Sequence, residues 1–378
     1  MKKTIMIIAG ETSSDRLGGN LVTELESINP DLTFIGYGGL RMKQAGVEIL
    51  YDLVSLALIG FIEVIRHLGL FYKILKEIES RLSSGSVDLL ILIDYPGLNM
   101  RVARLGRKYN VPVIYYVSPQ TWAWGKDREK KLAELVNLMI VIFPFEEKFY
   151  KDVGCPVEYV GHPLVEYAHP SKPYQELISE FGLDSENPII GIFPGSRKQE
   201  IYHHLPVILE TINPLQIERP KIQWILCESE SLPEGYINTG GNIKSIRGRV
   251  YDIMSVSNFI IASSGTVTTE SLLISTPVIV IYKVSLLSYI IGRFLVKVPH
   301  ISMINILAGK RLVPELIQGD LTMRNLKRHI TRFIDIPDLL NKIRADMKSV
   351  KVELGDAGAS RRAAALVNSF LQKGNISK

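Results

Sequence analysis

Short apolar runs alternate along the chain with longer amphipathic stretches. The runs that are rich in β-branched residues and show no alternation of polar and apolar positions are 5–8, 89–93, 113–117, 139–143, 189–193, 223–227, 259–262 and 278–282. Parallel strands buried on both faces have this pattern, and the amphipathic stretches between them form crossover helices. The pattern therefore predicts an α/β protein in which a parallel, Rossmann-like sheet is built twice.

A segment rich in proline and turn-forming residues, 161–174, separates the two series of predicted strands. With a boundary near residue 165, we predict an N-terminal domain over 1–165, a second domain over 166–350, and a C-terminal helix and tail over 351–378. A chain of 378 residues accommodates two domains, because one domain usually has about 100–200 residues. The last helix is expected to return to the first domain.

Turn-forming residues follow several of the predicted strands. These turns are 10–13, 94–97, 118–120, 194–197 and 263–266. In open parallel sheets, ligands bind beyond the carboxyl ends of the strands, which meet at one edge of the sheet. We therefore expect the two sheets to face a cleft that these turns line.

Composition and charge narrow the class of protein without identifying it. Apolar residues make up 46% of the chain and charged residues 22%, as in an ordinary folded protein. The net charge of +5 suits an anionic small molecule or an anionic membrane surface and is too small to indicate nucleic acid. Cys155 and Cys227 have no metal-binding spacing, which offers no zinc site and favours a reducing compartment, the cytoplasm.

Two apolar segments exceed what a sheet protein needs. A helix over 285–298 would carry its large apolar side chains on one side and its serines, arginine and lysine on the other. Such a helix either lies in a membrane interface or packs on a neighbouring core, and the sequence leaves both open. The segment 53–75 is similar, but its charges exclude a spanning helix, which needs about 20 nearly uncharged residues. Any membrane contact is therefore expected to be peripheral.

The sequence FPGSRKQE, residues 193–200, follows an apolar strand and precedes a helix. A turn in this position presents backbone N–H groups and the positive end of the helix dipole, which together favour phosphate. We predict that Gly195, Ser196 and Arg197 hold a phosphate group, with Arg197 supplying a forked cation. The alternative is that Arg197 is an exposed arginine in a surface ion pair.

A longer set of segments makes the chain recognisable. In order along the chain they are AGETSSD (9–15), DYPGLN (94–99), SPQTWAW (118–124), FPFEEKFY (143–150), GHPL (161–164), FPGSRKQE (193–200), SSGTVTTE (263–270) and NILAGKRLVPELIQ (305–318). As a set they resemble the lipid-A-disaccharide synthase family, over about residues 5–325. The combination is far more specific than any one segment.

The resemblance implies a two-domain glycosyltransferase of the GT-B type that needs no metal or other cofactor, at the cytoplasmic face of a Gram-negative inner membrane. The family transfers 2,3-diacylglucosamine from UDP-diacylglucosamine to the 6-hydroxyl of 2,3-diacylglucosamine 1-phosphate (lipid X). The products are a β-1,6-linked lipid A disaccharide 1-phosphate and UDP. The first domain would hold the lipid acceptor and the second the UDP-sugar, and a homodimer is left open.

Two carboxylates are candidates for the base in such a transfer. The acceptor hydroxyl loses its proton as the bond forms, and a carboxylate at a sheet edge suits this role. Asp94 ends a buried strand and matches the family's DxPxFN aspartate, which makes it the leading candidate. Glu11 is the competing base, or a group that orients the hydroxyl. The alternative for Asp94 is capping of the turn at Tyr95-Pro96.

The second domain carries the other predicted contacts. Without a metal, the departing diphosphate has to be stabilised by N–H groups, a helix end and an arginine, as in the PGSR turn. Ser264, Gly265 and Thr266 are expected near the phosphates or the sugar. Glu270 would bind the ribose hydroxyls, as in other GT-B enzymes, or be an acidic residue in a first helical turn. Asn305 matches the family's NxLAG segment and would bind a sugar hydroxyl or phosphate, or cap a helix.

The tryptophans and histidines in the quoted segments are assigned no catalytic role. Trp122 and Trp124 are expected at the interdomain edge, along an acyl chain, or in the core. His162 is expected to shape the hinge, and His203 and His204 to be solvated on the helix after the PGSR turn. No histidine spacing in the chain indicates a metal site.

The chain departs from the family pattern at a few positions. Ser14 stands where a glycine is usual, Gly97 and Leu98 replace a common Asp-Phe, and Thr268 and Thr269 make the segment before Glu270 more polar. None of these changes removes a proposed catalytic group. They are expected to affect the choice of substrate or acyl chain.

Other classes of protein fit parts of the sequence. A UDP-sugar 2-epimerase or another GT-B transferase would need the same two turns, but the apolar segments favour a lipid substrate. A catalytically silent lipid-binding protein would be expected to lack Asp94, Arg197 or Glu270, and all three are present. A nicotinamide enzyme would need a GxGxxG turn after the first strand, and GETSSDRLGG lacks that spacing.

Overall fold

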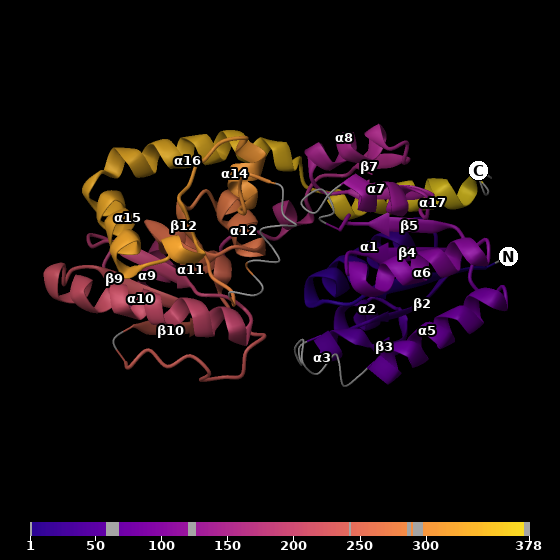
Figure 1. Cartoon of the computed structure of the whole chain (residues 1–378), viewed down its shortest axis with the longest axis horizontal. Helices are drawn as coiled ribbons and strands as arrows, with labels where there is room; N and C mark the ends of the chain where they lie inside the picture. Colours follow the sequence, from indigo (N-terminus) through magenta and orange to yellow (C-terminus); the bar gives the residue numbers. More distant parts are fainter. Residues whose placement is uncertain are drawn as a thin grey trace. The chain divides into compact units, whose positions relative to one another are not determined.

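The computed structural model describes residues 2–57, 68–119, 126–241, 243–285, 289 and 298–373. The chain forms two compact units, which are coloured along the sequence in Figure 1. Unit 1 consists of Met1–Pro163 and Leu354–Lys378, and unit 2 of Leu164–Glu353. Each unit is built around its own parallel sheet, which confirms the predicted fold class. The predicted cleft between the sheets stays a prediction.

Unit 1 contains a seven-stranded parallel sheet in the order β3-β2-β1-β4-β5-β6-β7. Its strands are β1 (Lys3–Ala9), β2 (Leu32–Gly38), β3 (Glu48–Asp52), β4 (Leu89–Ile93), β5 (Val113–Tyr116), β6 (Leu138–Val141) and β7 (Val157–Tyr159). Its described helices are α1 (Thr12–Ile28), α2 (Leu40–Gln44), α3 (Leu53–Ala57), α5 (Leu68–Ser83), α6 (Pro96–Lys108), α7 (Lys126–Ala133), α8 (Pro144–Asp152) and α17 (Ala359–Gln372).

The inner strand β1 is buried on both faces of the sheet. Met6 and Ile8 share a buried cluster with residues of α5 and α6 on one face. Ile5 and Ile7 are equally buried and point to the opposite face, because successive side chains of a strand alternate. Helices therefore cover both faces, and this explains why the strand shows no alternation of polar and apolar residues.

The C-terminal helix α17 returns to unit 1 and packs against α1. Lys3 Nζ donates a hydrogen bond to the carbonyl oxygen of Leu371 over 2.7 Å. Near the unit boundary, the backbone N–H of His162 donates to the carbonyl oxygen of Leu354 over 2.8 Å. This bond joins the place where the chain leaves unit 1 to the place where it comes back.

Unit 2 contains a six-stranded parallel sheet in the order β10-β9-β8-β11-β12-β13. Its strands are β8 (Ile189–Phe193), β9 (Gln223–Glu228), β10 (Lys244–Arg247), β11 (Phe259–Ser263), β12 (Val278–Tyr282) and β13 (Glu315–Ile317). Its described helices are α9 (Tyr174–Glu180), α10 (Lys198–Glu218), α11 (Val250–Val256), α12 (Thr266–Ile274), α14 (Met303–Ala308), α15 (Met323–Asp335) and α16 (Pro337–Lys351).

The two apolar segments singled out in the sequence are only partly described. In 53–75, the residues 58–67 lie outside the described residues, while Ile74 of α5 is buried in the core of unit 1. In 285–298, only residues 285, 289 and 298 are described, and Trp122 and Trp124 also lie outside the described part. Among the described residues, no helix is long and apolar enough to cross a membrane.

Candidate functional site

Asp94 and Glu11 follow neighbouring strands at one edge of the unit 1 sheet. Strands β1 and β4 pair directly, with Ala9 beside Ile93, so the residues that come next lie at the same carboxyl edge. Burial and the negative charge of Glu11 raise the pKa of the Asp94 carboxyl from 3.8 to about 6, against a lowering by the Tyr95 backbone N–H. A carboxylate with a pKa close to the working pH is suited to accept a proton from a hydroxyl.

The turn that carries Asp94 is strained and firmly held. Asp94 and Tyr95 have φ angles of 46° and 45°, in the left-handed region that non-glycine residues rarely adopt. The Asp94 N–H donates to the Tyr116 carbonyl oxygen over 3.2 Å. Its carbonyl oxygen accepts from Tyr115 Oη over 2.5 Å and from Asn99 Nδ2 over 2.8 Å. These hydrogen bonds to the main chain of Asp94 fix the position of its backbone, from which the carboxyl side chain extends.

Gly10 and Tyr95 pack against each other beside the two carboxylates. A Cβ added to Gly10 would lie 2.3 Å from Cδ1 of Tyr95, so no larger residue fits unless the ring moves. Asp15, in the same segment, has a structural role. Its carboxylate accepts three backbone N–H groups at the start of α2 over 2.7–3.2 Å. The motif AGETSSD therefore serves both the turn and the neighbouring helix.

In unit 2 the two predicted ligand-binding turns lie side by side. Strands β8 and β11 pair directly, with Phe193 beside Ala262. The PGSR turn leaves β8 and enters α10, and the SSGT turn leaves β11 and enters α12. Both turns therefore stand at the carboxyl edge of the same sheet, where ligands bind in open α/β folds.

An internal carboxylate already occupies the amides of the PGSR turn. Glu200 Oε2 accepts the backbone N–H of Ser196 over 2.8 Å and that of Arg197 over 3.4 Å. Gly195 has a φ angle of 135°, and a Cβ on it would lie 2.4 Å from Glu200 Oε2. The amides of the turn thus bind an anion in the structure, and this anion is the carboxylate of Glu200. The exposed guanidinium of Arg197 makes no salt bridge with any described residue, so the predicted alternative of a surface ion pair is not observed.

His204 is buried, and the expectation that it is solvated is wrong. Its Nδ1–H donates to the Pro194 carbonyl oxygen over 2.7 Å, and its Nε2 accepts the Lys283 N–H over 2.9 Å. These two partners fix the neutral tautomer. Burial lowers the pKa of the imidazole in agreement with that state. The side chain ties the PGSR turn to the end of β12.

The SSGT turn is fixed by hydrogen bonds of Ser264 and has open space beside Gly265. Ser264 N–H donates to the Ile281 carbonyl oxygen over 3.0 Å, and its Oγ donates to the Ile301 carbonyl oxygen over 3.0 Å. A Cβ on Gly265 would meet no atom within 4 Å, and its φ of 166° is extended backbone. Neither packing nor backbone conformation requires a glycine there, so the space beside it is available to a ligand. Thr266 is exposed at the start of α12.

Glu270 lies beyond the first turn of α12, which contains no acidic residue. The predicted alternative of a first-turn acidic residue therefore does not fit. Tyr251 Oη donates to Glu270 Oε1 over 3.0 Å. Burial raises the pKa of the Cys227 thiol to about 12, and the negative charge of Glu270 contributes. Because α12 begins directly after the SSGT turn, Glu270 lies near the start of a helix that leaves this sheet edge.

Asn305 is fully buried and serves as a brace. Its Oδ1 accepts the N–H groups of Leu312 and Val313 over 2.8 and 2.9 Å. Its Nδ2 donates to the Val313 carbonyl oxygen over 3.0 Å and to Glu315 Oε1 over 2.8 Å. All its side-chain capacity is used inside the protein, so the predicted contact with a sugar hydroxyl or phosphate finds no support in this geometry. The predicted helix cap is supplied by Ser302, whose side chain accepts the Asn305 N–H.

The structure thus divides the predicted site residues into three groups. Asp94 and Glu11 share the carboxyl edge of unit 1. Gly195, Ser196, Arg197, Ser264, Gly265, Thr266 and Glu270 share that of unit 2, and Asn305 lies in the interior. Sequence reasoning missed the roles of Tyr95, Glu200 and His204. The positions of Glu200 and Tyr95 inside quoted motifs were the only available signal.

Comparison with known proteins identifies the class and the family. Two solved structures share the fold over nearly the whole chain. A Staphylococcus aureus MnaA–UDP co-structure matches with a TM-score of 0.67 at 13% identity, covering 98% of this chain and 97% of that one. A putative UDP-N-acetylglucosamine 2-epimerase from Listeria monocytogenes matches with a TM-score of 0.68 at 12% identity, covering 100% and 99%. With its two parallel sheets, the chain has the GT-B fold.

Sequence comparison is more specific than the fold. The lipid-A-disaccharide synthetase family matches residues 5–370. A lipid-A-disaccharide synthase from Geobacter sulfurreducens is 44% identical over 374 residues, which cover 98% of this chain and 97% of that protein. The chain belongs to the lipid-A-disaccharide synthase family, and the predicted resemblance is confirmed. The 2-epimerase alternative is not favoured, because the likeness to epimerases is confined to the fold.

Proposed function

We propose that the protein joins UDP-2,3-diacylglucosamine to 2,3-diacylglucosamine 1-phosphate and releases UDP. The product is the β-1,6-linked lipid A disaccharide 1-phosphate. Membership of the family over residues 5–370 supports the reaction. The single structural observation that carries the chemistry is Asp94, a partly buried carboxyl at the carboxyl edge of the unit 1 sheet whose pKa is raised to about 6.

In this proposal, Asp94 is the general base of unit 1. The carboxylate accepts the proton of the acceptor 6-hydroxyl while the oxygen forms its bond to the anomeric carbon. The bond from that carbon to the UDP oxygen breaks, and the electron pair leaves with the diphosphate. Attack opposite the leaving group inverts the anomeric centre. Glu11 acts on Asp94 by keeping its pKa high enough to hold the proton transiently.

Unit 2 is proposed to bind the UDP part of the donor. Arg197 supplies a forked cation, and the PGSR amides at the start of α10 supply N–H groups and the helix dipole. These groups stabilise the charge of the leaving diphosphate without a metal. Because Glu200 occupies the same amides in the structure, an incoming diphosphate has to displace or repel its carboxylate.

The SSGT turn and Glu270 are proposed to complete the donor site. The open space at Gly265 allows a phosphate or sugar to approach the main chain closely. The Glu270 carboxylate can accept two hydrogen bonds from the paired ribose hydroxyls while Tyr251 holds its other side. The acceptor is a lipid, so we also propose peripheral contact with an anionic membrane at the cytoplasmic face of the inner membrane. We also propose that the protein associates as a homodimer.

One assay tests the reaction directly. Purified protein is incubated with UDP-2,3-diacylglucosamine and lipid X, and separately with UDP-N-acetylglucosamine alone. The disaccharide 1-phosphate and UDP should form in the first mixture, with no epimerised sugar in the second. Turnover only in the second mixture would contradict the proposal. Flotation with anionic and zwitterionic vesicles tests the membrane contact, which fails if the protein binds neither.

A further inference from the structure

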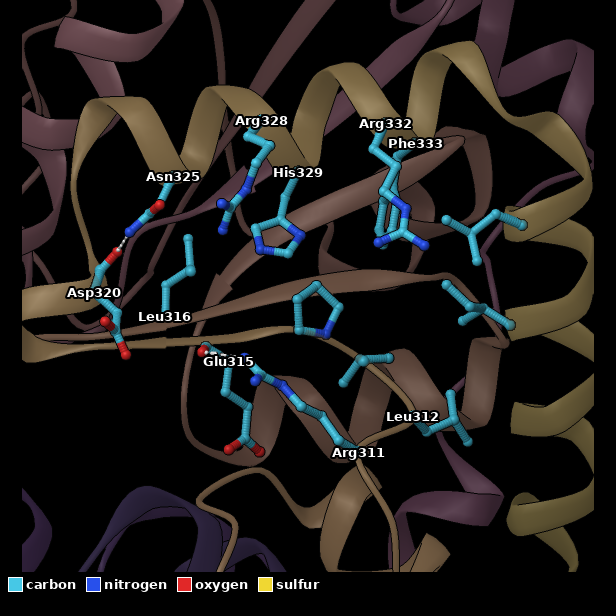
Figure 2. Close-up of a pocket in the computed structure, with 14 residues that line it drawn as sticks. Arg311, Leu312, Glu315, Leu316, Asp320, Asn325, Arg328, His329, Arg332 and Phe333 are labelled. Carbon is cyan, nitrogen blue, oxygen red and sulfur yellow. Dashed lines mark hydrogen bonds between the residues drawn. The ribbon is translucent and has the colours of Figure 1, made fainter.

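A polar cavity lies in unit 2, and neither the PGSR turn nor the SSGT turn lines it. It has a volume of about 530 Å³ and is bordered by the chain that leads into the edge strand β13 and by helices α15 and α16. A cavity of this size is within the range of small-molecule sites. Figure 2 shows it from the side, with α15 above and the segment 311–316 below.

Cationic side chains reach this cavity from two sides. Arg328, His329 and Arg332 extend from α15 toward the strand, and Arg311 approaches from the opposite segment, as Figure 2 shows. Arg311 Nη2 donates to the Glu315 carbonyl oxygen over 2.9 Å. Within the described ranges, no carboxylate forms a salt bridge with any of these three arginines.

Two other arginines of unit 2, by contrast, have carboxylate partners. Arg219 pairs with Asp335 over 2.6 Å, and Arg249 pairs with Glu180 over 2.7 Å. Arg328 and Arg332 are one helical turn apart on α15, where two like charges repel each other. A local excess of positive charge is therefore maintained at the cavity although it costs stability.

The acidic residues that line the cavity do not cancel this charge. The Glu315 carboxylate is buried, and it accepts hydrogen bonds from Ser302 Oγ and from Asn305 Nδ2 over 2.6 and 2.8 Å. Asp320 remains as a single exposed carboxylate in the lining. Burial lowers the pKa of His329, and the positive charges of the neighbouring arginines lower it further, in agreement with their arrangement around the cavity.

We propose that this cavity binds a phosphate group, held by the guanidinium groups of Arg328 and Arg332. Arginine forks match phosphate oxygens in a bidentate manner, which explains three arginines without carboxylate partners. Apolar side chains of Leu312, Phe333 and Ile343 complete the lining. They suit a phosphate that is attached to an organic group. The phosphate belongs either to a lipid headgroup or to a soluble phosphate compound, and the experiment distinguishes these two sources.

The test compares two variants with equal loss of charge. The cavity variant is Arg328→Ala/Arg332→Ala. The matched control is Arg324→Ala/Lys348→Ala, which changes exposed residues of α15 and α16 that do not line the cavity. Inorganic phosphate is titrated by calorimetry and by the NMR signal of the His329 ring, in the presence of saturating UDP to block the donor site. Vesicles of phosphatidylcholine with and without phosphatidylglycerol form the second arm.

Phosphate binding should weaken about tenfold or more in the cavity variant and change less than about twofold in the control. If binding to phosphatidylglycerol vesicles falls in parallel, the natural ligand is a lipid headgroup, and if only phosphate binding falls, it is a soluble compound. Equal behaviour of the two variants in both arms overturns the proposal. Should the alanine variant unfold, Arg328→Lys/Arg332→Lys keeps the charge, loses the fork, and is expected to bind phosphate more weakly than the unaltered protein.

Discussion

The buried imidazole of His204 donates a hydrogen bond to the carbonyl oxygen of Pro194, which lies ten residues earlier in the chain and is the first residue of the PGSR turn. With Lys283 N–H bound to its other nitrogen, His204 holds the turn in place from inside the unit. A donor site that depends on backbone amides needs such a support, because amides stabilise an anion only when their positions are fixed beforehand.

We predict that His204→Ala weakens UDP binding about tenfold and lowers the melting temperature, since two buried backbone groups lose their partners. Calorimetric titration with UDP and a thermal scan measure both effects. The neighbouring His203→Ala serves as the control and should leave UDP affinity unchanged, because no described hydrogen bond involves the His203 ring. Equal UDP affinity in the His204 variant and the unaltered protein would remove the positioning role.

Asp94→Asn should reduce kcat by about 10²- to 10⁴-fold while UDP affinity stays the same. In the unaltered protein, the base acts only when deprotonated, so kcat/KM should rise with pH through about 6 and then level off. Steady-state rates measured between acidic and alkaline pH provide the profile. If the variant retains unaltered turnover, Asp94 is a turn residue and not the base.

The raised pKa of Asp94 also predicts how Asp94→Asn changes the free energy of unfolding. Because the folded-state pKa of Asp94 is raised above its unfolded value, its contribution favours folding below about 3.8 and is lost as the pH rises through about 6. Asp94→Asn is therefore expected to stabilise the protein by about 1–3 kcal/mol at pH 8 and by little at pH 4. Urea unfolding at both pH values gives the comparison. A variant that is less stable at pH 8 would contradict the raised pKa.

Glu11→Gln should move the acidic limb of the rate profile to lower pH, because the negative charge of Glu11 helps to raise the pKa of Asp94. The plateau rate should fall less than in Asp94→Asn if Glu11 acts through Asp94. The full pH profile separates the two roles. Loss of turnover at every pH, with an unmoved limb, would instead make Glu11 the base.

Glu200→Gln is predicted to tighten UDP binding severalfold. The glutamine oxygen can still accept the Ser196 N–H, but the charge that opposes a diphosphate at the same amides is removed. Direct UDP titration is the measurement, with Glu210→Gln, an exposed residue further along α10, as the matched control. Weaker binding in the Glu200 variant would mean that the carboxylate is needed mainly to cap the helix.

Most inner strands of the two sheets could be predicted from the sequence, whereas the inner strand β2 and the edge strands could not. The strand β4, Leu89–Ile93, is a run of five buried apolar residues, and burial on both faces dictates that composition. The edge strands β10 and β13 are short, and β10 has the sequence KSIR with mostly exposed side chains. An edge strand has one neighbour and less buried surface, so its sequence carries little signal.

The sequence predicted which residues of the candidate site lie at the sheet edges, but not the hydrogen bonds that their side chains make. The rule that ligands bind beyond parallel strands placed Asp94, Arg197 and Glu270 at sheet edges. It could not show that Glu200 folds back on the PGSR amides, because that contact depends on one side-chain rotamer. The prediction that His204 is exposed was wrong because packing decides which face of α10 lies against the sheet. Asn305 was assigned to a ligand because its hydrogen-bond partners, such as Val313, lie in a later loop that the local sequence does not reveal.

Because α17 packs against α1, unit 2 is synthesised completely before unit 1 has all of its helices. Unit 2 is one uninterrupted stretch of chain, whereas unit 1 needs its last helix, which leaves the ribosome after all of unit 2. The face of α1 that packs against α17 therefore stays uncovered until residues 359–372 have been synthesised. Premature termination after residue 353 would yield a finished second unit attached to an unfinished first one, a species prone to capture by chaperones or proteases.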